Sequence, residues 1–308
     1  MAHRISRSLI CVGMFGTLLS ACVALRAAPL PGQAQGQSAE REAGLPAAGK
    51  TEYAYGDAPL QKLDFWHAAS TTPAPLIVFV HGGGWKRGDK KDATGVPKID
   101  HLKSEGYALA SINYRLVPAA TVEQQAADVC AAIAYLRANA ARLGVDPARI
   151  VLMGHSAGAH LVALVGTAPR FVAAAGLSLA DIRGVITLDG AGYDVPRQMA
   201  DAGPFLRATY AQAFGGDPAR QRALSPALQS SAPGTPPFLI AHIDRADGKA
   251  QSEALAASLV RGGTRADVVA LGGTGLRGHM AINRDFGSAD YPATAVVDAW
   301  LRKLLRPQ

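Results

Sequence analysis

Residues 150–164 read Ile-Val-Leu-Met-Gly-His-Ser-Ala-Gly-Ala-His-Leu-Val-Ala-Leu, an apolar strand-like run joined to an apolar helix-like run. The junction is the pentapeptide Gly154-His155-Ser156-Ala157-Gly158, a Gly-x-Ser-x-Gly pattern. At so tight a turn the serine takes a strained backbone conformation, and glycines two residues to either side let neighbouring elements approach without a Cβ clash. The stretch therefore predicts a strand-to-helix turn that holds the Ser156 hydroxyl where a reactant can reach it.

Strand and helix patterns alternate from Lys50 onward, which indicates one large α/β domain with a mostly parallel sheet covered on both faces. The chain has 308 residues, 49% of them hydrophobic, and this suits a core of that kind. Residues 190–236 are irregular by comparison, so we expect a small lid or pocket wall there. Strands are expected at 76–80, 107–113, 149–153, 183–188, 237–243 and 266–271, and helices at 94–105, 121–142, 157–167, 250–262 and 292–305.

A glycine-rich loop follows the first of these strands and reads His81-Gly82-Gly83-Gly84-Trp85. Bare backbone N–H groups in such a loop can point at one spot, as a tetrahedral oxyanion requires, and each donor lowers a barrier by about 3 kcal/mol. The expected donors are the amides of Gly83 and Gly84, joined by that of Ala157. His81 is expected to fix the loop by hydrogen bonding. Trp85 either lines a substrate pocket or packs in the core.

Serine is a poor nucleophile at neutral pH, so a general base must follow it, and the chain order of this layout is Ser, acid, His. Of the eight histidines, only three follow Ser156. His160 lies one helical turn beyond the serine and His242 lies within a strand pattern, so both are expected to be structural. His279 follows the last expected strand in a glycine-rich loop, residues 272–278, and is the predicted base.

The acid of this layout is expected in the loop after the strand at 237–243, where Asp244 and Asp247 are the candidates. Its task is to accept the imidazole Nδ1 proton and to stabilise the imidazolium that forms. Asp247 is better spaced, a few residues beyond the strand and just before a helix. Asp244 is the alternative, and spacing alone leaves both open.

Several classes of protein are excluded by motif and charge. The net charge is +7, with a pI of about 9.4. The sequence contains no run of five basic residues and no zinc-finger or helix-turn-helix pattern, so nucleic acid is not an expected partner. It also lacks a Walker loop, a His-Glu-x-x-His motif and a cysteine cluster. Residues 273–278 match a dinucleotide pattern, but the strand and acidic residue that must follow are missing, so no cofactor or metal is expected.

The N-terminus resembles a lipoprotein-type signal over residues 1–22. His3, Arg4 and Arg7 precede a short apolar stretch that ends in Leu-Ser-Ala-Cys22, which resembles a bacterial lipobox with Cys22 as the lipidated residue. Residues 23–50 are rich in Ala, Gly, Pro and Gln and predict a flexible linker. The chain is therefore expected to be exported, in the periplasm or cell envelope, and to meet the membrane only through this anchor.

Only Cys130 remains in the expected catalytic domain, residues 51–308, so no disulfide is predicted there. It lies inside a helical pattern, where a small buried hydrophobe is expected.

With these residues in hand, the chain resembles the α/β-hydrolase fold esterases of the hormone-sensitive-lipase and feruloyl-esterase-like groups. The shared features are the His-Gly-Gly-Gly-Trp loop, Asn-Tyr-Arg-Leu at 113–116, Asp-Pro at 146–147 and Gly-His-Ser-Ala-Gly. The resemblance covers residues 51–308 and implies an eight-stranded sheet, no cofactor and hydrolysis of short acyl or aryl esters. Two departures stand out: Ile243 replaces a glycine of the usual acid loop, and the loop before His279 is lengthened.

The predicted function is thus a serine carboxylesterase that hydrolyses a small-molecule ester through an acyl-enzyme. Two alternatives stay open. Related arylformamidases carry a similar glycine loop and serine turn and cleave an amide. A non-catalytic surface binding protein on a hydrolase scaffold would instead show a broken triad or a blocked oxyanion loop.

Overall fold

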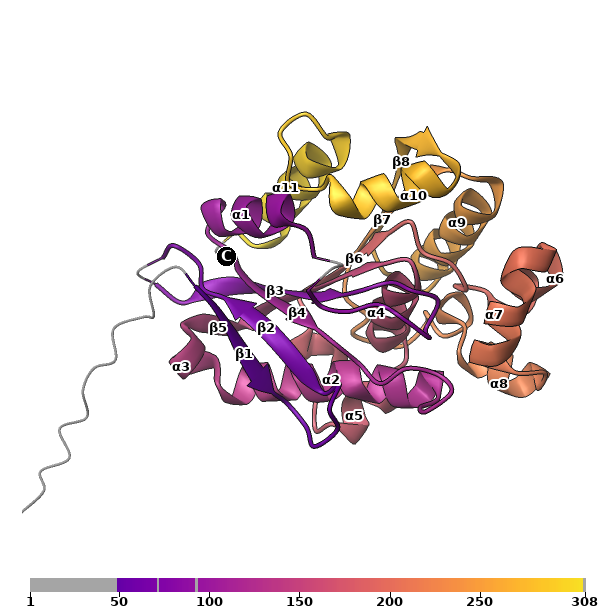
Figure 1. Ribbon diagram of the computed structural model, residues 1–308, viewed down its shortest axis with the longest axis horizontal. Helices are drawn as coiled ribbons and strands as arrows, with labels where there is room; N and C mark the ends of the chain where they lie inside the picture. The colour runs from indigo at the N-terminus through magenta and orange to yellow at the C-terminus, as the bar shows by residue number, and fades with distance from the viewer. Residues whose placement is uncertain (1–48, 71, 92–93, 307–308) are drawn as a thin grey trace, which may run out of the picture. The chain divides into compact units, whose positions relative to one another are not determined.

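The computed structural model describes residues 49–70, 72–91 and 94–306 (Figure 1). The expected signal segment 1–22 with Cys22, and almost all of the expected linker 23–50, lie outside the described residues. Lys50 is the first residue of a strand, so the folded domain has begun one residue before the expected boundary at 51.

Eight strands form one sheet in the order β1-β2-β4-β3-β5-β6-β7-β8. The β1–β2 and β2–β4 pairs are antiparallel, and the five remaining neighbouring pairs are parallel. The expected mostly parallel sheet is therefore confirmed. The strands are β1 Lys50–Ala54, β2 Lys62–Trp66, β3 Ala74–Val80, β4 Ala108–Ile112, β5 Val145–His155, β6 Gly184–Leu188, β7 Phe238–Asp244 and β8 Ala266–Thr274.

Helices cover both faces of the sheet (Figure 1). Alternation along each strand divides the core, as β3 shows: Leu76, Val78 and Val80 face one apolar cluster, and Ile77 and Phe79 face the other. The first cluster includes residues of α2 (Val122–Ala138), α4 (Ala157–Thr167), α5 (Pro169–Ala174) and α9 (Ala246–Arg261), and the second includes residues of α1 (Val96–Ser104), α10 (Gly275–Arg284) and α11 (Pro292–Leu304).

The expected lid segment 190–236 is more regular than its composition suggests. It contains three short helices, α6 (Val195–Asp201), α7 (Pro204–Phe214) and α8 (Pro218–Ala223), and the 3₁₀ turn η2 (Pro226–Leu228). Proline occupies the first turn of each, where its missing N–H has no intrahelical partner to lose. Arg220 of α8 bonds Glu123 of α2 at 2.7 Å, which ties this segment to the main helix layer.

One expectation near the C-terminus is wrong. The glycine-rich stretch 272–278 was expected to be a loop before His279, but β8 runs to Thr274 and helix α10 begins at Gly275. Gly278 lies within that helix, where the helix packs against the backbone of β8. A Cβ at this position would lie 2.7 Å from the Gly273 carbonyl carbon and 2.9 Å from Ile243 Cδ1. Glycine here permits close contact between helix and strand, which outweighs its poor helix propensity.

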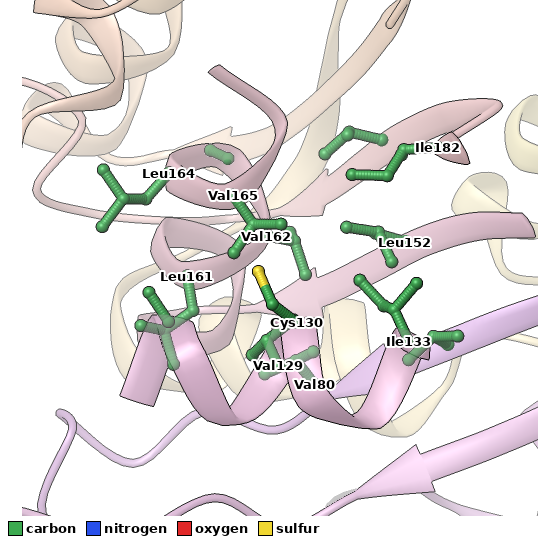
Figure 2. Close-up of a cluster of buried hydrophobic side chains, with 14 of the residues drawn as sticks. Val80, Val129, Cys130, Ile133, Leu152, Leu161, Val162, Leu164, Val165 and Ile182 are labelled. Atoms are coloured by element: carbon green, nitrogen blue, oxygen red, sulfur yellow. The ribbon is translucent and has the colours of Figure 1, made fainter. Parts of the chain in front are cut away.

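Cys130 is buried in the apolar cluster between α2 and α4, among Val80, Leu152 and Leu161 (Figure 2). Burial raises the pKa of its thiol to about 12, so it stays protonated and acts as a small hydrophobe, as predicted. The remaining short helical elements are α3 (Ala140–Leu143) and η1 (Leu179–Asp181). Among the helices of the described residues, none combines the length and apolar character needed to cross a membrane.

Candidate active site

Ser156 occupies the turn between β5 and α4, with φ 55° and ψ −120°. This left-handed conformation is strained for a residue with a side chain, and close packing on both sides enforces it. A Cβ on Gly154 would lie 2.3 Å from the Gly158 carbonyl oxygen, and one on Gly158 would lie 2.1 Å from that of Val80. Both glycines of the motif are therefore required by backbone contact, and the serine is held at the carboxyl edge of the sheet.

The glycine loop lies directly against Ser156. A Cβ on Gly82 would be 2.9 Å from Ser156 Cβ, so the loop backbone passes beside the hydroxyl. Gly83 and Gly84 both have positive φ, 116° and 62°, which turns the chain sharply at this point. Ala157 is the first residue of α4, where backbone N–H groups lack intrahelical acceptors. The three predicted oxyanion donors thus belong to two segments that meet at the serine.

The glycine loop is braced from beneath by β4 and the residues after it. His81 is fully buried, stacks on Tyr114 with ring centroids 4.4 Å apart, and bonds through Nδ1 to the Gly82 carbonyl at 2.7 Å. The Tyr114 hydroxyl donates to the His81 carbonyl at 2.9 Å. Asn113 accepts the Lys90 N–H at 2.6 Å and so fastens the far end of the loop. His81 fixes the loop, as expected, and takes no part as a base.

Trp85 packs under the lid segment. Its side chain is 2% exposed and contacts Phe214 and Tyr210 of α7, with ring centroids 4.7 and 5.9 Å away. Its indole N–H donates to His160 Nδ1 at 3.3 Å. Of the two roles left open for Trp85, the geometry shows packing, because almost no indole surface remains for a substrate. The tryptophan instead anchors α7 over the glycine loop.

His279 lies on α10 and forms a short pair with Asp189, whose Oδ2 accepts from Nδ1 at 2.5 Å. Asp189 follows β6 directly, is fully buried and has φ 44°. Burial alone would raise the pKa of the Asp189 carboxyl, but the hydrogen bond from His279 and the charge of Arg245 outweigh it and hold that pKa below its usual range. Asp189 is therefore ionised at neutral pH, and His279 is left with Nε2 to exchange a proton.

Neither aspartate chosen from the sequence contacts His279. Asp247 Oδ2 instead bonds Arg245 Nη1 at 3.4 Å and Gln198 Nε2 at 3.5 Å. Asp244 is the exposed last residue of β7. The expectation that one of these two accepts the imidazole proton is not met, because the His279 ring on α10 contacts Asp189, the residue after β6, instead.

Ser156 and the His279–Asp189 pair are brought together by their neighbours. The Ser156 N–H donates to the carbonyl of Leu188, the residue before Asp189, at 3.1 Å. The His155 ring lies beside His279, with centroids 4.6 Å apart, and its Nε2 bonds the His279 carbonyl at 2.8 Å. Within the described ranges, no hydrogen bond joins Ser156 Oγ to the His279 ring, and such catalytic bonds commonly tighten only when substrate binds.

Backbone strain marks the same place. Three non-glycine residues with positive φ occur in the described part of the chain, namely Trp85, Ser156 and Asp189. All three border this site, and strained backbone of this kind concentrates at functional sites. The sequence did offer one signal for Asp189, since it follows a buried strand and precedes Gly190. An acid at that position lies at the carboxyl edge of a parallel sheet, next to the serine strand.

Two buried histidines stay neutral beside the site. Burial lowers the pKa of His155 to about 3, with the neighbouring His279 adding to the shift, and burial lowers that of His160 to about 4. His160 Nε2 bonds the Leu224 carbonyl at 2.8 Å, which leaves Nδ1 to accept from Trp85. A proton on His160 Nδ1 would face the Trp85 indole N–H and break this hydrogen bond. The roles predicted for His160 and His242 as structural residues agree with their burial.

This arrangement predicts a loss of stability in mild acid. The unfolded chain takes up a proton at His160 near pH 6.5 and the folded chain only near pH 4, so the free energy of unfolding falls as pH drops through that window. We expect the wild type to lose about 3 kcal/mol more than H160Q, whose amide can bond both partners without titrating. Urea unfolding at intervals between pH 7 and 4 measures this, and parallel curves for the two proteins would exclude the assignment.

Among residues 49–70, 72–91 and 94–306, no group of three or more His, Cys, Asp or Glu side chains is arranged to hold a metal ion. The side chains described above bring a hydroxyl, an imidazole and a carboxylate beside the glycine loop.

Comparison with known proteins gives partial matches in sequence. Residues 63–176 match the family model BD-FAE. Esterase LipC of Mycobacterium tuberculosis is 40% identical over 114 residues, which make up 36% of this chain and 28% of LipC. The probable isoprenylcysteine alpha-carbonyl methylesterase ICMEL1 of Arabidopsis thaliana is 37% identical over 110 residues, 35% of this chain and 23% of that protein. The matched region spans only about a quarter of these curated relatives.

Solved structures match over most of the chain. Thermogutta terrifontis esterase 2, in a structure phosphonylated by sarin, is 25% identical with a TM-score of 0.69, covering 86% of this chain and 98% of that one. Esterase B of Lactobacillus rhamnosis is 22% identical with a TM-score of 0.66, covering 83% and 84%, and this likeness concerns the fold alone. The sequence match over 63–176 includes both the glycine loop and the serine turn.

Proposed function

We propose that this chain, which has the α/β-hydrolase fold and resembles BD-FAE-like esterases over residues 63–176, is a serine carboxylesterase. One observation carries the proposal: a strained serine and a short imidazole–carboxylate pair, Ser156 and His279–Asp189, meet at one edge of the sheet beside a glycine loop. Strained backbone concentrates at functional sites, and here it holds the half-buried Ser156 hydroxyl where a substrate can reach it.

In the first half of the reaction, Ser156 Oγ attacks the carbonyl carbon of the ester while His279 Nε2 takes its proton. The imidazolium then gives this proton to the alcohol that leaves. Asp189 holds the Nδ1–H and so fixes the neutral tautomer with Nε2 free, and its buried negative charge stabilises the imidazolium. The product of this half is an acyl-Ser156 ester and a free alcohol.

The negative oxygen of the tetrahedral intermediate is stabilised by the amides of Gly83, Gly84 and Ala157. The loop is held rigidly by Asn113 and Tyr114, so these dipoles need no reorganisation as charge develops. In the second half, His279 takes a proton from water, which attacks the acyl carbon. Collapse of the second intermediate restores Ser156 and releases the carboxylic acid.

Short acyl groups are favoured by the position of α7. A Cβ on Gly84 would lie 2.9 Å from Thr209 Cγ2, so this helix lies close over the glycine loop. Trp85, packed against Phe214, holds the helix there. An acyl chain extending past the loop must therefore displace α7, which costs packing energy.

We expect the wild type to hydrolyse p-nitrophenyl acetate and butyrate with a kcat/KM at least tenfold above that for the octanoate. S156A should lose about 10⁴-fold or more in kcat, because the nucleophile is absent. Initial rates on both proteins measure this, with circular dichroism as the control for folding. Faster cleavage of N-formylkynurenine than of any ester would assign the site to amide chemistry instead, and equal rates for S156A would remove Ser156 from the mechanism.

We further propose that the enzyme is exported as a lipoprotein anchored at Cys22. Support for this comes from the sequence alone, namely the short apolar stretch and the Leu-Ser-Ala-Cys22 tetrapeptide. Mass spectrometry of the mature N-terminal peptide should find diacylglycerol on Cys22. An unmodified N-terminus at any other residue would contradict the anchor.

A further inference from the structure

Arg245 is shared between two carboxylates behind the site. It follows β7 directly, as the residue before α9, and its side chain is 18% exposed. Nε lies 3.2 Å from Asp189 Oδ2, and Nη1 lies 3.4 Å from Asp247 Oδ2. Asp189 Oδ2 is also the oxygen that accepts from His279. The Arg245 guanidinium therefore lies between two carboxylates. One is Asp189, which contacts His279, and the other is Asp247, the acid that the sequence favoured.

The packing around this contact is close. A Cβ on Gly248, in the first turn of α9, would lie 3.0 Å from Arg245 Nη2 and 3.1 Å from Asp189 Oδ1. Asp189 Oδ1 also receives the Ile243 N–H at 3.3 Å. The Asp189 carboxylate thus accepts a hydrogen bond from a backbone N–H on one oxygen and from the imidazole on the other. The guanidinium adds an ion pair to that second oxygen, and its Nε and Nη2 have no hydrogen-bond partner among the described residues. Asp247 is joined in turn to Gln198 of α6, so the network reaches the lid segment.

We propose that Arg245 is a positioning residue of this site: it holds Asp189 in line with His279, and its charge, partly offset by Asp247, sets the acid limit of activity. The inference rests on the proposed function. It also assigns Asp247 an indirect role: this carboxylate is the counter-ion of Arg245 and not the partner of His279.

The sign of the effect follows from Coulomb's law. His279 must be neutral to take the proton of Ser156, and a positive charge at Arg245 opposes a second positive charge on the imidazole. Removing the guanidinium charge therefore favours the imidazolium, and activity is lost at a higher pH. Removing the Asp247 charge leaves Arg245 less compensated and acts in the opposite direction.

Other charged or titratable groups surround this pair and stay constant in the comparison. They include His155 on β5, Lys98 on α1, Tyr193 after β6 and Tyr210 on α7. They also include Tyr291 and the pair of Arg284, the last residue of α10, with Asp285. The buried amine of Lys98 lies 3.7 Å above the Phe79 ring and bonds Asn283. Only Arg245 bridges Asp189 and another carboxylate among these described groups.

The test is the pH dependence of kcat/KM for p-nitrophenyl acetate in four variants. R245Q should move the acid limb up by about half to one pH unit and lower the plateau about tenfold. R245K keeps the charge and should leave the limb in place while lowering the plateau. D247N should move the limb down by about half a unit or less, and R245Q/D247N should return it toward the wild-type position.

The inference would be overturned if the acid limb of the R245Q profile lay within about 0.2 pH units of the wild-type limb, on the order of the error of such profiles. Equal upward shifts in R245Q and R245K would also overturn it, because they would indicate loss of packing without an effect of charge. If R245Q does not fold, the opposite shift in D247N still decides the matter. Failure of the proposed function is distinguishable, since then the wild type itself would show no turnover that depends on Ser156.

Discussion

Replacing Asp189 by asparagine should lower kcat for p-nitrophenyl acetate by about four orders of magnitude, whereas D247N should lower it less than tenfold. Asp189 accepts the His279 Nδ1–H at 2.5 Å, and Asp247 makes no contact with His279. An asparagine amide can donate to Nδ1 and so stabilise the tautomer that carries its proton on Nε2. Such an imidazole cannot take the proton of Ser156, and no buried charge remains to stabilise the imidazolium.

The two variants form a matched pair, because each replaces one carboxylate by an amide of the same shape. Single-turnover kinetics with far-ultraviolet circular dichroism separate a catalytic loss from misfolding. A loss of 10⁴-fold in D247N with near-normal turnover in D189N would reverse the assignment and restore the expectation drawn from the sequence, a loop acid after β7. KM should change little in either protein, because neither carboxylate contacts the ester.

Gly158→Ala should lower the free energy of unfolding by about 3 kcal/mol or more, or prevent folding altogether. Its Cβ would lie 2.1 Å from the Val80 carbonyl oxygen and 2.5 Å from that of His81. Both atoms belong to the backbone at the end of β3, in the middle of the sheet, where they cannot withdraw. A shift that removes these clashes would move α4, and Ser156 and Ala157 would move with it.

Gly166→Ala in the same helix is the control. Its Cβ would meet side-chain atoms only, Val185 Cγ2 at 2.8 Å and Phe238 Cζ at 3.1 Å, and these can turn aside. Alanine also gains up to about 1 kcal/mol over glycine in helix propensity, so we expect a net loss below about 1.5 kcal/mol. Urea unfolding compares the two, and a G158A protein as stable as G166A would show that the serine turn is packed less closely than described.

Much of the fold could be predicted because long buried elements carry strong local patterns. Strands β3 to β8 and helices α1, α2, α4, α9 and α11 follow from apolar runs and periodicity. The first two strands have weaker signals: β1 alternates exposed and half-buried residues at the start of the domain, and Lys62 and Asp64 interrupt the apolar residues of β2. The helix α10 was concealed by Gly275 and Gly278, which favour a loop until the backbone contact with Gly273 is known.

The candidate site divides in the same way. Ser156, the glycine loop and His279 are marked by neighbours in sequence, so local motifs were enough to propose them. Asp189 depends on which strand end the His279 ring contacts, and no short motif records that contact. Arg245 illustrates the same limit, because its position between Asp189 and Asp247 arises only when the ends of β6 and β7 lie side by side.

The central claim, that Ser156 is a nucleophile activated by His279 and Asp189, is tested most directly by mass spectrometry after incubation with a fluorophosphonate. The account predicts one adduct per chain, located on the peptide that contains Ser156 and absent from S156A. It also predicts slow or undetectable labelling of H279A and D189N, because without the base the hydroxyl is not activated. A folded wild-type protein that stays unlabelled, or an adduct on another residue, would contradict it.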